Sequence, residues 1–187
     1  MRIQIVVILI AFFYAGPVVG KEIAGVALAE TITQKNGTKL LLNGAGVRSK
    51  FFFKVYIGAL YLESVSQEVT TVLNSDVGKQ LIMHFLYKEV SRDDLVEAWN
   101  VGFNSNGSAD QLAKLSSQIN AFNDMFETVK SGDRIILDYT PAGGTSVFIG
   151  EELKGVIEGK AFNDLLLSIW LGKSPVDEDL RDDLLGK

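Results

Sequence analysis

Few side chains in this chain are suited to chemistry, and the types that are missing exclude several kinds of site. The sequence contains no cysteine and a single histidine, His84. A thiol nucleophile, a thiolate metal site and any site that needs two imidazoles are therefore excluded. The strongest remaining candidate is Arg48, because a guanidinium presents a planar fork of donors that matches a carboxylate or a developing oxyanion.

The other polar clusters are better explained by helix ends and solvated surfaces. Asp93 and Asp94 follow Ser91, a residue type that caps helices, and carboxylates favour the positive end of a helix. The acidic run over residues 177–183 does not have the ligand spacing of a calcium loop. His84 lies in an apolar segment with strand-like alternation, which is typical of a structural histidine. We therefore predict no metal site, no cofactor and no catalytic residue.

Charge and length narrow the class of protein. The chain has 18 basic and 23 acidic residues, which gives a net charge of −5. Because a nucleic acid backbone is polyanionic, its long-range interaction with this chain would be repulsive, and we expect no nucleic acid partner. Residues 21–187 are enough for one domain with a sizeable core.

The N-terminal residues have the order of a secretory signal peptide. Arg2 precedes an apolar run over residues 3–14, and small residues at 15–20 follow that run. The run is shorter than the roughly 20 apolar residues that a permanent membrane helix needs. We predict a signal peptide over residues 1–20, a domain over residues 21–187, no stable membrane span after cleavage, and a periplasmic or secreted location.

The domain has the pattern of an antiparallel sheet backed by helices. Strand-like segments with hairpin turns occur over residues 23–63, 80–87 and 134–157. Helical patterns occur over residues 69–73, 91–103, about 110–127, 162–171 and 176–185. Because strands and helices do not alternate singly, we predict an α+β fold rather than a parallel sheet. The aromatic density of residues 51–62 predicts a strand that is buried on both faces or borders a ligand cleft.

Two segments in the first half of the chain and four short motifs in the second half occur in an order that is typical of one family. The segments are Leu42 to Arg48 and Phe53 to Leu62; the motifs are Ser131-Gly132-Asp133, Gly143-Gly144-Thr145, Gly159 to Phe162 and Ile169 to Gly172. Together they resemble the chalcone isomerase family, especially its bacterial chalcone isomerase-like members. The resemblance implies an open-faced β-sandwich, in which an antiparallel sheet is covered by a helical layer and a ligand cleft lies between them.

The resemblance also implies roles for two residues. The family contains isomerases, which close a chalcone into a flavanone, and non-catalytic relatives that bind fatty acids. In both branches an arginine at the position of Arg48 lies in the cleft, where it stabilises an oxyanion or holds a carboxylate. Tyr56 occupies a position where the fatty-acid binders have a tyrosine and the isomerases have a threonine, so this position resembles the binders.

The isomerases further need a tyrosine, a lysine and an asparagine on the helix that follows the central strands. In this sequence those positions fall near Leu95, Ala98 and Gly102, whose side chains transfer no proton. A further threonine of the enzymes falls at about Ile169. Because one positioned proton-transfer group contributes about 10²–10⁴-fold to a rate, these departures favour binding over catalysis.

We therefore predict non-catalytic binding of a fatty acid or a similar hydrophobic carboxylate by Arg48, Tyr56, Leu95, Trp99 and Ile169. Apolar residues at helical spacing either line a tunnel for the acyl chain or belong to the ordinary core: Leu95, Trp99, Phe103, Phe162, Leu166 and Ile169. Two alternatives stay open. One is an isomerase, an intramolecular lyase of the chalcone isomerase type, that uses Arg48 for oxyanion stabilisation. The other is an envelope protein-interaction module whose cleft is filled.

Overall fold

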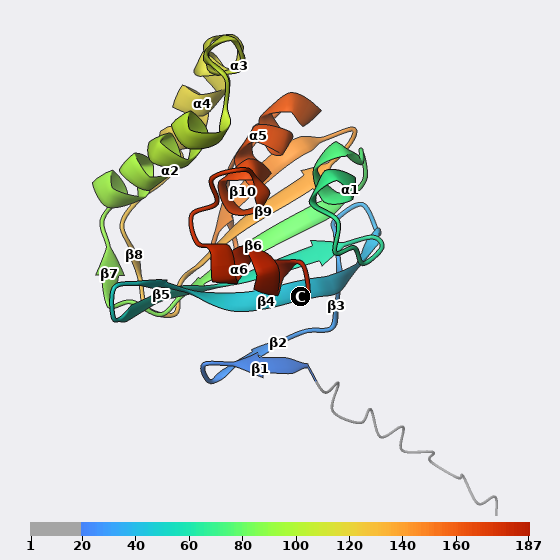
Figure 1. Ribbon diagram of the computed structural model, residues 1–187, viewed down its shortest axis with the longest axis vertical. Helices are drawn as coiled ribbons and strands as arrows, with labels where there is room; N and C mark the ends of the chain where they lie inside the picture. The colour runs from blue at the N-terminus through green and yellow to red at the C-terminus, as the bar shows by residue number, and fades with distance from the viewer. Residues whose placement is uncertain (1–19) are drawn as a thin grey trace, which may run out of the picture.

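An antiparallel sheet of seven strands organises residues 20–187, which are the residues that the computed structural model describes. The order across the sheet is β11-β10-β9-β6-β5-β4-β3 (Figure 1). The strands are β3 (Thr31–Thr33), β4 (Lys39–Lys50), β5 (Phe53–Leu62), β6 (Lys79–Phe85), β9 (Arg134–Thr140), β10 (Gly144–Ile149) and β11 (Glu152–Ile157). Two short ribbons pair β1 (Lys21–Ile23) with β2 (Val26–Leu28), and β7 (Glu89–Val90) with β8 (Val129–Lys130).

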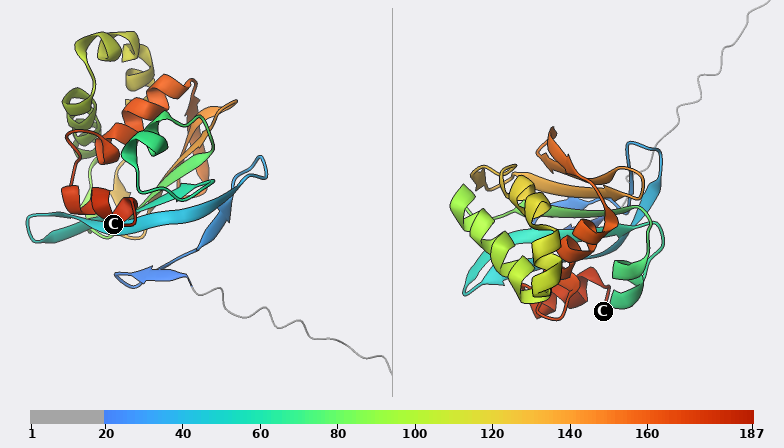
Figure 2. Two further views of the ribbon diagram at one scale, coloured as in Figure 1. Left: turned by 45° about the vertical axis from the view of Figure 1, so that its right-hand side comes forward. Right: turned by 90° about the horizontal axis from the view of Figure 1, so that it is seen from above.

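The helices cover one face of this sheet, and the β1–β2 ribbon lies against the other (Figures 1 and 2). They are α1 (Val69–Asn74), α2 (Arg92–Asn106), α3 (Ala109–Lys114), α4 (Ser116–Asn123), α5 (Lys160–Leu171) and α6 (Glu178–Leu184). This arrangement confirms the predicted α+β open-faced sandwich. None of these helices combines the length and the apolar character that a membrane crossing requires. The predicted signal peptide, apart from Gly20, lies outside the described residues.

The start of α2 is fixed by a local hydrogen bond that the sequence predicts. The side-chain oxygen of Ser91 accepts a hydrogen bond from the backbone N–H of Asp94 at 3.1 Å, as an N-cap residue does. Leu95, Trp99 and Phe103 are then the buried residues of the helix. The predicted stripe is confirmed, and it turns two aromatic rings towards the sheet.

The structure divides the single helix predicted over residues 110–127 into α3 and α4. Leu115, with φ −99° and ψ 6°, ends the first helix and precedes the second. Its side chain is buried, as are those of Phe122 and Phe126. The prediction of one helix was wrong because apolar spacing indicates which side chains enter the core, whereas the packing of those side chains decides the path of the backbone.

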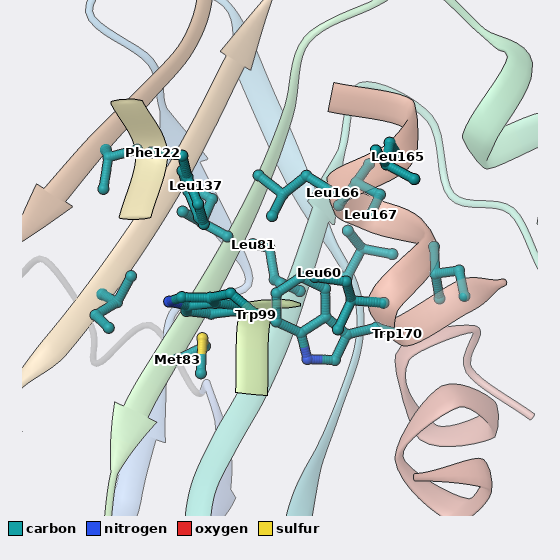
Figure 3. Packing of buried hydrophobic residues seen from close by; sticks show 14 of the residues in the cluster. Leu60, Leu81, Met83, Trp99, Phe122, Leu137, Leu165, Leu166, Leu167 and Trp170 are labelled. Atoms are coloured by element: carbon teal, nitrogen blue, oxygen red, sulfur yellow. The ribbon is translucent and has the colours of Figure 1, made fainter. Parts of the chain in front are cut away.

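Aromatic rings fill the space between the sheet and the helices. The ring centroid of Phe122 lies 4.7 Å from that of Phe126, 5.4 Å from that of Phe162 and 5.9 Å from that of Phe103. Tilted and edge-on contacts at these separations are the favourable arrangements of aromatic pairs. Leucines of the central strands complete this core from the sheet side, among them Leu60, Leu81 and Leu137 (Figure 3).

An extra residue in β4 decides which of its side chains face the helices. The pairing of β4 with β5 shifts between Leu42 and Gly44, so Asn43 has no partner on β5. Because side chains alternate across a strand, one extra residue moves every later side chain to the opposite face. Leu42 packs on the side of the β1–β2 ribbon, whereas Gly44 and Arg48 face the helices.

Hydrogen bonds from its own side chain hold this bulge in place. The amide nitrogen of Asn43 donates to the carbonyl oxygens of Ser66 at 3.0 Å and Leu184 at 2.8 Å. Its side-chain oxygen accepts from the backbone N–H of Ser66 at 2.6 Å. The bulge is therefore tied to the segment before α1 and to the end of α6.

Helix α6 lies directly on β4 because two glycines there have no side chain. A Cβ atom on Gly44 would meet the carbonyl oxygen of Leu184 at 2.6 Å, and one on Gly46 would lie 2.5 Å from the Cβ of Asp183. On the neighbouring strand, a Cβ on Gly58 would meet only the ends of two leucine side chains, Leu180 at 3.3 Å and Leu184 at 3.6 Å. An added side chain at Gly44 or Gly46 of β4 is therefore less well tolerated than one at Gly58 of β5.

We expect Gly44→Ala to lower the free energy of unfolding by roughly 1–3 kcal/mol, because the added methyl group must displace the backbone of α6. Urea denaturation monitored by circular dichroism measures this loss. Gly58→Ala is the matched control and should cost clearly less, since a leucine side chain can move aside. Equal losses for the two variants would contradict the close approach of α6 to β4.

Candidate functional site

A cleft of about 730 Å³ opens between the helices and the end of the sheet where β4 turns into β5. This volume lies within the range typical of small-molecule sites. The walls come from β4, β5, β6, α2, α5 and the segment after α5. Apolar side chains form most of them: Val55, Met83, Phe85, Leu95, Trp99, Ile169, Trp170 and Val176.

The structure brings all five predicted ligand-binding residues to this one cleft: Arg48, Tyr56, Leu95, Trp99 and Ile169. They come from β4, β5, α2 and α5, which are distant in the sequence. Three other residues predicted as either tunnel wall or ordinary core are Phe103, Phe162 and Leu166; they are buried in the core and do not border the cleft. The shared cleft places the five residues together, and their binding role stays a prediction.

Arg48 and Tyr56 are direct partners on neighbouring strands. They are paired in the register of β4 and β5, and the guanidinium carbon of Arg48 lies 5.6 Å from the ring centroid of Tyr56. The Nε atom of Arg48 is buried and has no hydrogen-bond partner among residues 20–187. A buried N–H that is left unpaired is costly, so an acceptor that enters the cleft here would relieve that cost.

The hydroxyl group of Tyr56 is buried and keeps its proton. Its ring is only 3 % exposed, and its hydroxyl oxygen accepts a hydrogen bond of 2.8 Å from the Nε1 atom of Trp170. Burial raises the pKa of Tyr56 to about 12, although the charge of Arg48 opposes the shift. The phenol therefore keeps its proton at neutral pH and can donate it in a hydrogen bond.

A third donor lies on α2. The Nε1 atom of Trp99 is buried and has no hydrogen-bond partner within the part of the chain that the structure describes. The indole ring of Trp99 packs edge-on against Trp170, with centroids 5.7 Å apart (Figure 3). Three residues with side-chain donors thus line this mostly apolar cleft: Arg48, Tyr56 and Trp99.

Charged side chains of both signs surround the mouth. Lys50, Glu89, Asp94 and Glu97 line it and are exposed. The carboxylate of Asp94 accepts a hydrogen bond of 2.6 Å from the hydroxyl of its helix-capping serine, and that of Glu89 lies 3.8 Å from the Nζ atom of Lys130. The acidic groups are therefore in contact with solvent, whereas the guanidinium nitrogen that lacks a partner lies inside.

Three positions of α2 line the cleft: Leu95, Ala98 and Gly102. The family resemblance places the proton-handling residues of the isomerases near these positions. At Gly102 the two helices approach closely, because a Cβ atom there would lie 2.8 Å from the Cγ1 atom of Ile169. A lysine or asparagine at that position would require the side chain of Ile169 on α5 to move.

His84 lies outside the cleft. It alternates along β6 with Met83 and Phe85, which border the cleft, so its side chain faces the other side of the sheet. Partial burial and the nearby charge of Arg134 lower the pKa of His84. Among residues 20–187 no three His, Asp or Glu side chains gather in a way that could hold a metal ion.

Sequence reasoning missed Trp170 as a site residue. The helical spacing of α5 indicates a buried residue at this position, but not that its indole reaches the hydroxyl of Tyr56. Met83 and Phe85 were also missed, although strict alternation along β6 could have indicated that they face the same side. Their contribution depends on which face of the sheet the helices cover, and the alternation leaves that open.

Comparison with known proteins gives the following results. A family model described as chalcone isomerase-like matches residues 20–186. No curated protein matches the chain. Among solved structures, a fatty-acid binding protein of Arabidopsis thaliana has a TM-score of 0.61 at 17 % sequence identity, covering 83 % of this chain and 96 % of that chain. At this identity the likeness shows a shared fold.

We expect Tyr56→Phe to lower the free energy of unfolding by about 1–3 kcal/mol, because the Nε1 atom of Trp170 loses its acceptor while remaining buried. Thermal or urea denaturation measures the loss. Tyr87→Phe is the matched control, since the Tyr87 ring is 40 % exposed and its stability effect should be within about 0.5 kcal/mol of zero. If the two variants were equally stable, the hydrogen bond between Tyr56 and Trp170 would contribute nothing to the free energy of unfolding.

Proposed function

We propose that this chain, which belongs to the chalcone isomerase-like family, is a non-catalytic binding protein for a fatty acid or a similar hydrophobic carboxylate. The observation that carries the proposal is Arg48, a residue that lines a mostly apolar cleft and whose buried Nε atom has no hydrogen-bond partner among the described residues. A carboxylate at this point would supply both the missing acceptor and the missing negative charge.

The polar end of the cleft suits a carboxylate. A guanidinium remains charged at all physiological pH values and binds two carboxylate oxygens at once. Tyr56 and Trp99, which also line the cleft, carry neutral donors. Such an anchor prefers an anion over an ester or an alcohol, because only the anion accepts several hydrogen bonds and neutralises the arginine.

The remaining walls suit an acyl chain. Leu95, Ile169 and Met83 come from three different elements and border the cleft with apolar groups. Each methylene that moves from water into such surroundings contributes roughly 0.8 kcal/mol. A hydrocarbon tail therefore supplies most of the affinity, and the arginine end supplies orientation and the preference for an acid.

The same cleft is poorly equipped for the isomerase alternative. Leu95, Ala98 and Gly102 occupy the wall where a proton would be handled, and their side chains carry no proton. Tyr56 is a weak base candidate, because a phenol with a pKa of about 12 stays protonated at neutral pH. For catalysis, only the electrostatic effect of Arg48 would remain. The lack of proton-transfer groups therefore favours binding as the function.

Two further lines support this function and its setting. The structurally similar Arabidopsis thaliana protein is a fatty-acid binding protein. The predicted signal peptide leads us to propose that binding takes place in the periplasm or outside the cell. The carboxyl group of a free fatty acid is ionised at neutral pH, and Arg48 favours this anionic form.

Arg48→Met tests the anchor while keeping an apolar stem of similar length. We expect affinity for palmitate to fall about 10- to 100-fold, because a hydrogen-bonded charge contributes roughly 1.5–3 kcal/mol. Affinity for methyl palmitate should stay within a few-fold of the wild-type value. Isothermal titration calorimetry measures both ligands.

The matched control is Arg134→Met, which removes an exposed arginine that does not line the cleft. It should leave both affinities unchanged. Equal losses for acid and ester in Arg48→Met would show that the arginine acts through packing. An unchanged affinity for palmitate would refute the proposed anchor.

The chain contains two tryptophans, and both line the cleft. We therefore expect palmitate to change the intrinsic tryptophan emission, because the acyl chain would pack beside both buried indole rings and alter their surroundings. Saturation should follow the calorimetric titration. Binding without any change in emission would place the ligand elsewhere on the protein.

A further inference from the structure

Three consecutive phenylalanines are exposed at the turn between β4 and β5. Phe51 is 86 % exposed, Phe52 99 % and Phe53 58 %. The prediction that the aromatic run 51–62 is buried or borders a ligand cleft was therefore wrong for Phe52, which is exposed and does not line the cleft. The turn projects beyond the helical layer in the left view of Figure 2.

The backbone of this turn has an unfavourable conformation at one residue. Phe51 adopts a φ of 56°, in the left-handed region that favours glycine or asparagine. A bulky aromatic residue in that region costs free energy and recovers none by burial here. Exposed apolar side chains that are retained at such a cost mark a contact with an apolar environment.

The charges beside the phenylalanines are basic. Lys50 and Lys54 flank them directly, and both are exposed. Next to the turn, the ring of Tyr87 contacts that of Phe53 edge-on at 5.6 Å. The carboxylate of Glu89, which also lines the mouth, lies 3.8 Å from the Nζ atom of Lys130, which partly offsets its charge.

We propose that the hairpin turn Lys50–Lys54 docks this protein on the surface of an anionic phospholipid bilayer. The phenylalanine rings enter the boundary between headgroups and acyl chains, and the two lysines contact anionic headgroups. Aromatic rings flanked by cationic side chains match the layered polarity of this boundary. The net charge of −5 keeps the rest of the molecule away from such a surface, so docking has a defined orientation.

A protein partner fits this turn less well. Specific protein interfaces bury roughly 1,200–2,000 Å² in total, with well-packed apolar side chains at their centre. The exposed apolar surface here consists of three adjacent side chains at the end of one hairpin. A bilayer accepts a small protruding wedge without any need for shape complementarity.

The turn and the cleft share residues. Lys50, Phe51 and Phe53 line the mouth of the cleft, at the end of the same strands that carry Arg48 and Tyr56. Docking therefore brings the mouth to the lipid surface, where a fatty acid can pass between the bilayer and the cleft. This exchange role rests on the proposed function, whereas docking itself does not.

Flotation of the protein with vesicles tests the docking. The vesicles are phosphatidylcholine alone, or phosphatidylcholine with phosphatidylglycerol as a minor anionic component. We expect wild-type protein to bind the anionic vesicles more tightly. Phe52→Ser should weaken that binding about tenfold or more, because one exposed phenylalanine no longer enters the lipid.

Two further variants separate the apolar and the charged contributions. Lys50→Gln/Lys54→Gln should weaken binding to the anionic vesicles and leave binding to phosphatidylcholine unchanged. Leu153→Ser removes another exposed apolar side chain, 47 % exposed, from edge strand β11 and should change neither. Phe52→Trp should show a blue shift of its added emission when vesicles are present.

The outcomes are distinguishable from those of the binding proposal. Phe52 does not line the cleft, so Phe52→Ser should keep the wild-type affinity for palmitate in solution. Vesicle binding that is equal for wild type and Phe52→Ser, or a Phe52→Trp emission that vesicles leave unshifted, would overturn the docking. So would a wild-type protein that binds neither vesicle type but self-associates through Phe52.

Discussion

The arrangement of this cleft depends on one extra residue in a strand. Asn43 interrupts the pairing of β4 with β5 and is held there by hydrogen bonds to Ser66 and Leu184. Because side chains alternate along a strand, this bulge turns Gly44 and Arg48 towards the helices. Without it, the glycine would not lie beneath α6 and the guanidinium would emerge on the side of the β1–β2 ribbon. Packing of the terminal helix and placement of the cation are therefore consequences of the same local irregularity.

Two residues that line the cleft bury a donor without an acceptor. Arg48 and Trp99 each bury an N–H group that has no partner among residues 20–187. The hydroxyl oxygen of Tyr56 accepts a hydrogen bond from Trp170, while its proton remains available for donation. A folded protein rarely tolerates several unpaired donors in an apolar environment, since each costs about 1–3 kcal/mol. The cost of an unpaired donor is offset when an acceptor binds beside it. A carboxylate bound as proposed would supply an acceptor to Arg48, and relief of this cost would add to the preference for an anion.

One hairpin combines the two proposed roles of this protein. Its base carries Arg48 and Tyr56 inside the cleft, and its turn exposes Phe51 and Phe52 to the outside. A ligand that is almost insoluble in water gains from a short path between a lipid surface and its site, because each exposed methylene is unfavourable in solution. A rigid two-stranded connection keeps the mouth and the docking element at a fixed distance from each other.

The sequence by itself determined the elements and the chemical types in the cleft. Turn residues, alternation and the Ser91 cap gave the strands and the start of α2, and the family resemblance selected Arg48 and Tyr56. These features are local, so a linear pattern records them. Only the tertiary structure decided the break at Leu115 and the exposure of Phe52. It also decided the contact of Tyr56 with an indole more than a hundred residues away. These depend on how distant segments share the same space, and the spacing of residues along one chain does not contain that information.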